Sequence, residues 1–314
     1  MEKIYTIIIP HHNIPELLRR CLSSIPTRDD LQTIVVDDNS DPIYLDTLKN
    51  LAKIFPHIEF VFLNENKGGG HARNVGLSKA KGRYVMFADA DDFFMYCLND
   101  VLDDYENCQA DMVFFDAISQ DTDTFKVSYR VRHLNRMMLM YMKNPQKAEK
   151  QLRYVFGEPW CRLIKRSVIE DNTILFDEYM IHNDRKFSYL AAYYCKSVIV
   201  DQRAIYSQTV RIGSVSKTNY LDKLLIRTKV YGELNRFYKE NHIDLYEEKA
   251  LRPMMGFLVH WKLFEYRQCK KILKECGMSS FELTYRQFLY PYYLTKKIIT
   301  NVKEILVRMY DVSK

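Results

Sequence analysis

The stretch that decides the fold runs from residue 64 to residue 92. It reads Asn64-Glu65-Asn66-Lys67-Gly68-Gly69-Gly70-His71-Ala72-Arg73-Asn74-Val75-Gly76, then a short helical pattern, then Gly82-Arg83-Tyr84-Val85-Met86-Phe87-Ala88-Asp89-Ala90-Asp91-Asp92. Three consecutive glycines leave the backbone free to turn, and the pattern after them predicts the start of a helix. A helix N-terminus offers unpaired N–H groups that suit a phosphate.

Three carboxylates follow the apolar run at residues 84–88, which predicts a buried strand. They belong to Asp89, Asp91 and Asp92. Open α/β sheets bind ligands at the carboxyl ends of their strands, and Mg²⁺ uses one or two carboxylates together with substrate phosphates. The alternative is a solvated turn or an acidic helix cap, because Asp-x-Asp alone is common. The position after a strand makes the metal site and this alternative about equally supported.

Strands and helices alternate through the first half of the chain. Apolar runs predict strands at residues 5–10, 31–36 and 58–63, and helical spacing separates them at residues 15–25 and 43–54. This alternation predicts a mostly parallel α/β sheet flanked by helices. The loops after the first, second and fourth strands would then meet at one edge. We expect His11-His12-Asn13, Asp37-Asp38 and the acidic cluster to line one crevice there.

The second half is less regular. We expect a helix at residues 99–105, a strand at 111–116, and an excursion at 119–151 that shapes an acceptor pocket. Its methionines, Met137, Met138, Met140 and Met142, are either helix core or loose apolar surface. Residues 198–201 read as an edge strand, 205–206 as a further strand, and 211–216 as a polar loop. We therefore expect an α/β domain at 1–220 and a helical C-terminal region at 221–314.

Composition excludes several classes of protein. The chain has 314 residues, 47% of them hydrophobic, and a net charge of +6, which is too mild for a nucleic-acid signature. Its seven cysteines form no Cys-x-x-Cys pair, so we expect reduced thiols, a cytoplasmic protein and no zinc. The start of the chain runs straight into a strand, so we expect no signal peptide. A nicotinamide fingerprint and a P-loop are both disfavoured, because Gly68-Gly69-Gly70 fits neither.

Several short blocks follow one another along the chain. They are Ile9-Pro10-His11-His12-Asn13, Val36-Asp37-Asp38-Asn39-Ser40, Lys67 to Gly76, Gly82 to Asp92, Trp160-Cys161-Arg162-Leu163 and Asn183-Asp184-Arg185-Lys186-Phe187. In this order the blocks resemble the family 2 glycosyltransferases of the bacterial surface-glycan type, over residues 4–217. The resemblance implies a GT-A fold, Rossmann-like, with inverting chemistry.

The resemblance implies a role for each block. Asp38, beside Asp37, would accept a hydrogen bond from the base of the nucleotide, and Arg73 with Asp89 would border base and ribose. Asp91 would hold Mn²⁺ or Mg²⁺ against the diphosphate. Asp184 would be the catalytic base that takes the proton of the acceptor hydroxyl. The remaining donor-binding residues would be Pro10, His12, Asn13, Gly68 and Ala90.

Two departures and three alternatives stay open. His12 stands where the family has an aromatic residue, and Asn183 where it has Glu. Asp184 could instead be a helix N-cap. Asp37-Asp38 could form an Asx-turn, and Arg73 could be a surface helix residue.

The expected function is transfer of a sugar from a nucleotide sugar, a UDP-sugar in our interpretation, to a glycan or lipid-linked acceptor. A non-catalytic carbohydrate- or nucleotide-binding protein on a decayed fold is the alternative, suggested by Asn183. A nucleotidyltransferase would need a basic glycine-rich signature near the first strand, which is missing.

The C-terminal residues 285–314 are basic, and from Ile298 onward their apolar residues recur at three- and four-residue steps. This pattern predicts a helix that packs on the catalytic domain or on a second subunit in a homodimer. The other interpretation is a peripheral helix on the inner face of an anionic membrane, where a lipid-linked acceptor would be found.

Overall fold

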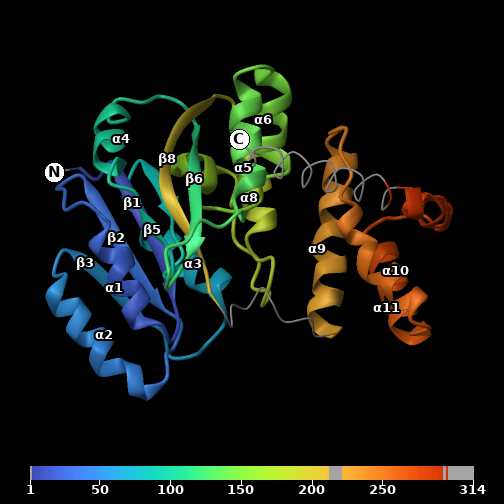
Figure 1. Ribbon diagram of the computed structural model, residues 1–314, viewed down its shortest axis with the longest axis horizontal. Helices are drawn as coiled ribbons and strands as arrows, with labels where there is room; N and C mark the ends of the chain where they lie inside the picture. Colours follow the sequence, from blue (N-terminus) through green and yellow to red (C-terminus); the bar gives the residue numbers. More distant parts are fainter. Residues whose placement is uncertain (1, 212–220, 293–294, 296–314) are drawn as a thin grey trace. The chain divides into compact units, whose positions relative to one another are not determined.

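The computed structural model describes residues 2–211, 221–292 and 295. The chain divides into two compact units, residues 1–218 and 219–314. The first unit holds the β-sheet, and the described part of the second is helical (Figure 1).

The first unit is built on one eight-stranded sheet with the order β3-β2-β1-β4-β7-β6-β8-β5. Its strands are β1 (Tyr5–His11), β2 (Leu31–Asp37), β3 (Ile58–Phe62), β4 (Tyr84–Phe87), β5 (Phe93–Phe94), β6 (Met112–Asp121), β7 (Arg162–Lys165) and β8 (Val198–Val210). The neighbouring pairs β3–β2, β2–β1, β1–β4 and β6–β8 are parallel. Only the contacts of β7 and β5 are antiparallel. The predicted mostly parallel α/β fold is therefore confirmed.

Helices cover both faces of the central strands. Ile7, Ile8 and Ile9 of β1 point alternately to the two faces, and all three are fully buried. On one face the approach is so close that a Cβ at Gly76 would lie 2.3 Å from a methyl group of Ile8. The helices of this unit are α1 (Pro15–Ser23), α2 (Pro42–Ile54), α3 (Gly69–Lys79), α4 (Leu98–Asp104), α5 (Arg132–Tyr141), α6 (Pro145–Tyr154), α7 (Arg166–Asp171) and α8 (Arg185–Tyr194).

Strand β8 corrects one prediction. The sequence predicts an edge strand at 198–201 and a separate strand at 205–206, but both belong to one 13-residue strand between β6 and β5. The reason is a register shift opposite residues 115–117 of β6. It accommodates the polar run that starts at Asp201, whose carboxylate accepts hydrogen bonds from the backbone N–H and guanidinium of Arg203.

The excursion expected at residues 119–151 is more ordered than its sequence indicates. β6 continues to Asp121, a turn is closed by a bridge between Gln120 and Val127, and α5 and α6 follow. Met137 and Met138 are buried on α5, so the helix-core interpretation holds for them. Met142, beyond the end of α5, is exposed.

The second unit contains α9 (Leu221–Glu240), the short 3₁₀ helix η2 (Glu248–Ala250), α10 (Arg252–Val259), α11 (Leu263–Glu275) and a further helix at residues 280–292. Its buried side chains include Leu234, Met254, Leu273 and Leu283. No helix among the described residues is long and apolar enough to cross a membrane. The amphipathic helix predicted from Ile298 onward, and residues 212–216 of the predicted polar loop, lie outside the described residues.

Candidate active site

The loops after β1 and β2 are joined by a buried histidine–carboxylate pair. Nδ1 of His11 lies 2.7 Å from Oδ1 of Asp37, while Nε2 accepts from the backbone N–H of Ile14. The Nδ1 proton therefore points at Asp37. Although burial alone would raise the pKa of Asp37, the bonds from His11 and from the hydroxyl and N–H of Ser40 hold it below its usual value. Asp37 thus anchors the two loops.

Asp38 fixes the glycine loop. Its carboxylate accepts from the backbone N–H groups of Lys67, at 3.0 Å, and of Gly68, at 2.7 Å. Gly68 has a φ of 89°, which a side chain would disfavour. Each oxygen of Asp38 retains a further lone pair. The buried carboxylate therefore holds this loop in place and has lone pairs that these two bonds do not use.

Asn13 and His12 lie beside Asp38 but differ in their hydrogen-bond partners. The side chain of Asn13 bonds twice to Asp41, through its amide N–H and its carbonyl oxygen, both at 2.8 Å. The ring of His12 is exposed and lies 3.1 Å from the carbonyl oxygen of Asp38. Pro10 is a partly buried residue of β1. The ring of His12 is therefore accessible to a ligand, whereas the side chain of Asn13 holds the loop in place.

Arg73 ties α3 to two other parts of the site. Its guanidinium lies 2.6 Å from Oδ1 of Asp89 and donates to the side-chain oxygen of Asn183 at 3.2 Å. It also lies over the ring of Phe176. Arg73 is buried, so the interpretation as a surface helix residue is excluded.

The three carboxylates after β4 come together as the sequence predicts. Asp89, Asp91 and Asp92 each offer an oxygen, and these oxygens lie within 4.8 Å of one another. Asp92 is 1% exposed and already accepts from the N–H of Thr209 and the hydroxyl of Tyr206. Asp89 and Asp91 keep side-chain exposures of 35% and 24%. Those two are the accessible ligands, and the buried Ala90 separates them.

The electrostatics of this cluster favour a cation. Burial raises the pKa of Asp89; Arg73 opposes the shift and Asp91 adds to it. Burial, together with the negative charges of Asp91 and Asp89, raises the pKa of Asp92 well above its ordinary value. Crowded carboxylates with oxygen-only donors are what hard divalent ions such as Mg²⁺ and Mn²⁺ bind. The residues present therefore fit such an ion.

Asp184 immediately precedes α8, in the cap position. Its side chain nevertheless makes no capping hydrogen bond in the described structure, so the N-cap interpretation loses its support. Burial raises the pKa of this carboxyl; Arg185 and Arg73 oppose the shift, whereas Glu158 and Asp89 add to it. Asp184 therefore has the properties of a carboxylate able to take a proton.

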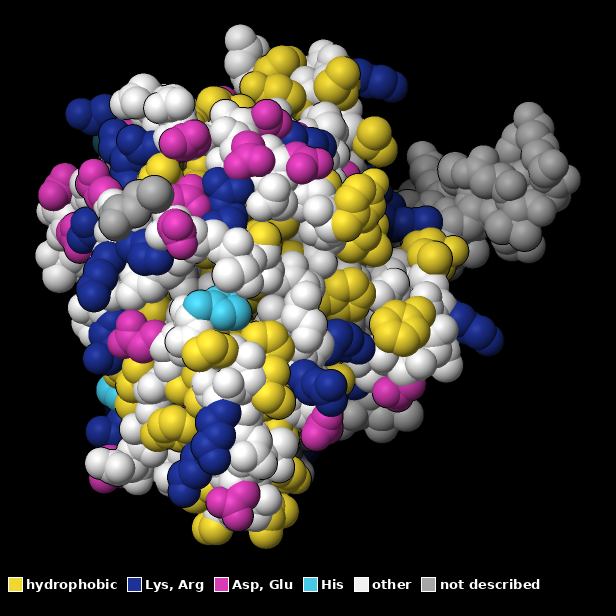
Figure 2. Space-filling model, turned by 90° about the vertical axis from the view of Figure 1, so that its left-hand side faces the viewer, with side chains coloured by type: hydrophobic (Ala, Val, Ile, Leu, Met, Phe, Trp, Pro, Cys, Tyr) yellow, Lys and Arg dark blue, Asp and Glu magenta, His cyan; other side chains and the backbone are white. Residues whose placement is uncertain are grey.

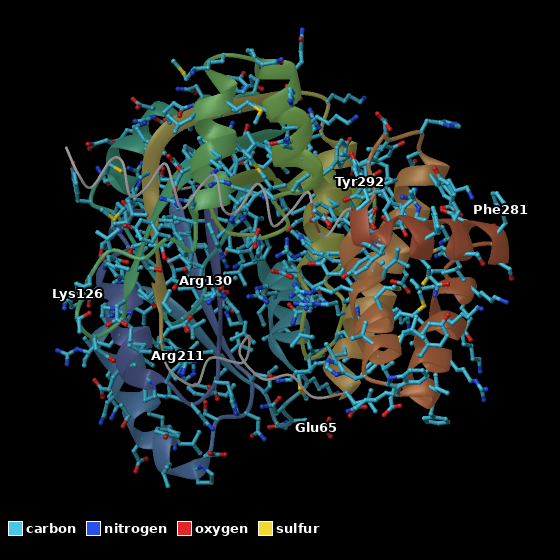
Figure 3. The ribbon with its side chains drawn as sticks, turned by 45° about the vertical axis from the view of Figure 1, so that its right-hand side comes forward. Glu65, Lys126, Arg130, Arg211, Phe281 and Tyr292 are labelled. Carbon is cyan, nitrogen blue, oxygen red and sulfur yellow. The ribbon has the colours of Figure 1, made fainter. Side chains whose placement is uncertain are left out.

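Several charged residues of this site were not predicted from the sequence. Arg211 lies with Nε 3.0 Å from Oδ2 of Asp91, and Arg20 donates to the backbone oxygen of the same residue. Figure 3 labels Arg211, which follows the end of β8. Glu158 pairs with Arg185 at 2.8 Å, beside Asp184. Arg211 opens the predicted polar loop at 211–216, Arg185 stands inside the matched block at 183–187, and Glu158 lies two residues before the block at 160–163. Their partners depend on tertiary structure.

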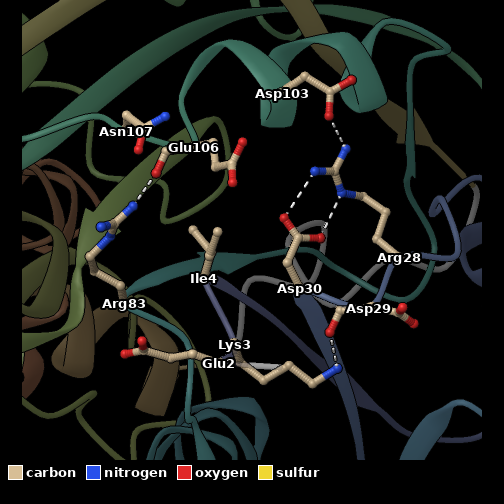
Figure 4. Close-up of a pocket in the computed structure, with 10 residues that line it drawn as sticks. All are labelled: Glu2, Lys3, Ile4, Arg28, Asp29, Asp30, Arg83, Asp103, Glu106 and Asn107. Carbon is tan, nitrogen blue, oxygen red and sulfur yellow. Dashed lines mark hydrogen bonds and ion pairs between the residues drawn. The ribbon is translucent and has the colours of Figure 1, made fainter.

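A cavity of about 560 Å³ lies away from this site, at the amino ends of β1, β2 and β4 (Figure 4). Its charges are largely satisfied internally. Arg28 makes two bonds to Asp30 and one to Asp103, and Lys3 donates to backbone oxygens. We therefore assign no ligand to it.

Comparison with known proteins points to one family. Residues 6–173 match the model of glycosyl transferase family 2. The chain is 24% identical, over 321 residues, to the uncharacterized glycosyltransferase YibD of Escherichia coli, covering 96% of this chain and 88% of that one.

Two solved structures share the fold. One is S. aureus TarS 1-349 in complex with UDP-GlcNAc, with a TM-score of 0.63 and 19% identity over 87% of this chain and 80% of that one. The other is the mannosyltransferase PcManGT from Pyrobaculum calidifontis with GDP-Man and Mn²⁺, with a TM-score of 0.54 and 17% identity over 96% and 83% of the two chains. These likenesses confirm a GT-A-like fold.

Proposed function

The chain belongs to glycosyl transferase family 2, and we propose that its domain at 1–220 moves a sugar from a nucleoside-diphosphate sugar to a hydroxyl of a glycan or lipid-linked acceptor, with inversion at the anomeric carbon. One observation carries this proposal. Arg73 bonds both to Asp89 of the acidic cluster and to Asn183, the residue before Asp184. The same arginine thereby links the proposed metal site to the segment that carries the proposed base.

The donor is held by the loops at the carboxyl edge of the sheet. Asp38 accepts from the base, the exposed ring of His12 stacks on it, and Asn13, Pro10, Gly68 and Ala90 shape the cleft. TarS is described with UDP-GlcNAc and PcManGT with GDP-Man, so relatives of this fold take different bases. We propose a UDP-sugar.

Asp91, with Asp89 beside it, would hold the divalent cation. When bound there, Mn²⁺ or Mg²⁺ would neutralise charge on the leaving diphosphate. Arg211 forms an ion pair with Asp91 in this structure. When a cation takes its place at Asp91, the guanidinium would be free to bind a phosphate oxygen of the donor.

Asp184 takes the proton of the acceptor hydroxyl as that oxygen forms its bond to the anomeric carbon. The bond from that carbon to the diphosphate breaks on the opposite face, and the nucleoside diphosphate leaves with the electron pair. A hydroxyl is a poor nucleophile until its proton is removed. Because its pKa is raised, Asp184 is a stronger base than an ordinary surface aspartate.

A thermal-shift panel of nucleotides and sugar nucleotides, with and without Mn²⁺, identifies the donor. The selected donor is then assayed for hydrolysis and for transfer. We expect one nucleoside diphosphate to stabilise the protein only with Mn²⁺, and its sugar conjugate to be consumed. Binding without any turnover would support the non-catalytic alternative, and no stabilisation by any nucleotide would contradict both.

A further inference from the structure

The second unit presents large aromatic side chains to solvent in two places. Trp261 and Phe264, at the connection between α10 and α11, are 83% and 71% exposed. On the helix at 280–292, Phe281 and Phe288 are 81% and 82% exposed (Phe281 is labelled in Figure 3). Single exposed rings are common, but several that gather on one face mark a surface that binds something.

These rings do not hold the second unit together. On the helix at 280–292, Leu283 is fully buried, and Gln287 bonds to the hydroxyl of Tyr266 at 2.7 Å. Phe281, Tyr285, Phe288 and Tyr292 follow one another at steps of four, three and four residues, which places them on one face. One side of this helix therefore packs inside the unit and another carries four exposed rings.

The α10–α11 connection is a formed structure as well. The backbone N–H of Trp261 bonds to the carbonyl oxygen of Leu258, and that of Lys262 to the carbonyl oxygen of Phe257. Phe257 itself is buried. The backbone thus holds Trp261 outward, next to the exposed Lys262.

Charge is distributed unequally between the two units. Residues 219–314 contain 18 Lys and Arg against 11 Asp and Glu, while residues 1–218 contain 28 against 29. The positive excess of the chain therefore resides entirely in the second unit. On the face of the first unit seen in Figure 2, basic and acidic side chains are interspersed.

We propose that the second unit binds an anionic lipid surface, with the exposed rings of the helix at 280–292, Phe281 and Phe288 among them, entering the headgroup region and the excess Lys and Arg of this unit neutralising lipid charge. Aromatic rings favour the membrane–water interface, and each nearby Lys or Arg adds attraction to anionic lipid. The same positive charge opposes a second copy of the unit on this surface, because two such units would repel each other. The proposal is independent of the donor and of the chemistry.

The test is sedimentation of the full-length protein with phosphatidylcholine vesicles, with and without phosphatidylglycerol, in the absence of donor and acceptor. We expect the protein to pellet with the anionic vesicles at low salt and to be released by high salt. The double variant Phe281→Ser/Phe288→Ser should bind about tenfold more weakly per ring removed. The matched control Tyr96→Ser/Ile43→Ser removes two equally exposed apolar side chains of the first unit and should bind like the wild type.

A second variant tests the charge. Lys271→Glu/Lys274→Glu reverses two exposed lysines of α11 and should weaken binding to anionic vesicles with the rings intact. Wild-type protein that stays in the supernatant with anionic vesicles at low salt would overturn the proposal. A wild-type dimer in light scattering that Phe281→Ser/Phe288→Ser dissociates, without vesicle binding, would assign the surface to a second copy instead.

Discussion

Among the described residues, the side chain of Asp184 makes no capping hydrogen bond and no ion pair. We expect Asp184→Asn to keep the fold and the nucleotide affinity, and to lower the rate of transfer by at least about 10², the usual scale for a general base. Steady-state transfer kinetics with a parallel nucleotide titration measure both. Asp171→Asn, an exposed aspartate at the end of α7, is the matched control. A variant at position 184 with a near wild-type rate would place the base elsewhere.

The pH dependence of transfer follows from the same residue. Only the ionised carboxylate can take a proton, and burial raises the pKa of Asp184 above its ordinary value of 3.8. The rate should therefore rise with pH through a midpoint above that value. In Asp184→Asn this acid limb should be absent from the pH–rate profile. If Asp184→Asn retains the same acid limb, that limb reports the ionisation of another group.

Glu158 supports the site through a partly buried ion pair. Burial alone would raise its pKa, but Arg185 and His133 hold it well below its usual range. The ion pair therefore contributes its full stabilisation of the folded state above the pKa of Glu158 in the unfolded chain, about 4.3. This contribution is lost as pH falls through the lower pKa of Glu158 in the folded protein. We expect Glu158→Gln to lower the free energy of unfolding by about 2 kcal/mol at pH 7, with the difference shrinking below pH of about 4.

Denaturant unfolding at several pH values measures this difference. Glu170→Gln provides the control, because Glu170 pairs with Arg166 at an exposed site and should change stability by less than about 0.5 kcal/mol. Equal effects of the two substitutions would mean that the Glu158 pair is no more than a surface pair.

At the scale of elements, the start of α3 is fixed by its contact with the loop before α8. A Cβ at Gly70 would lie 2.0 Å from the carbonyl oxygen of Asp177 and 3.1 Å from Cβ of Asn183. We expect Gly70→Ala to destabilise the protein by about 1–3 kcal/mol and to slow transfer, because the segment carrying Asp184 must shift. Thermal melts and transfer assays measure both.

Gly256→Ala on α10 is the matched control. Nothing lies within 4 Å of a Cβ at that position, so the same substitution should stabilise its helix by up to about 1 kcal/mol. A Gly70→Ala variant with unchanged stability and rate would mean that the contact between α3 and this loop is loose.

The elements that could be predicted from the sequence are those whose residues are nearly all buried. β1, β2 and β4 are buried along almost their whole length, with Pro10 of β1 partly buried, so each reads as a short apolar run, and the loops after them carry the predicted site residues. The residues of β8 were predicted to form two strands, because the polar residues at its bulge are typical of a turn. The bonding of Asp37 to His11, of Asp38 to the glycine loop and of Arg211 to Asp91 could not be read from sequence, because tertiary approach selects those partners.

At the scale of the whole molecule, the two units have separate tasks in this account. Every described residue that we place in the donor and catalytic site lies within residues 1–211. We therefore expect the Phe281→Ser/Phe288→Ser variant to bind nucleotide with wild-type affinity and to hydrolyse a soluble donor at the wild-type rate. Calorimetry and a hydrolysis assay without vesicles measure these quantities. A loss of nucleotide affinity would show that the second unit takes part in donor binding.

The central claim is that Asp91 makes donor binding depend on a divalent cation. Its most direct test is calorimetric titration of uridine diphosphate into the wild type and Asp91→Ala, each with Mn²⁺ and with chelator, and with Asp100→Ala as an exposed carboxylate control. We predict that Mn²⁺ strengthens binding at least about tenfold in the wild type and in Asp100→Ala, and has no effect in Asp91→Ala. Binding in Asp91→Ala with Mn²⁺ that equals the wild type would contradict the account.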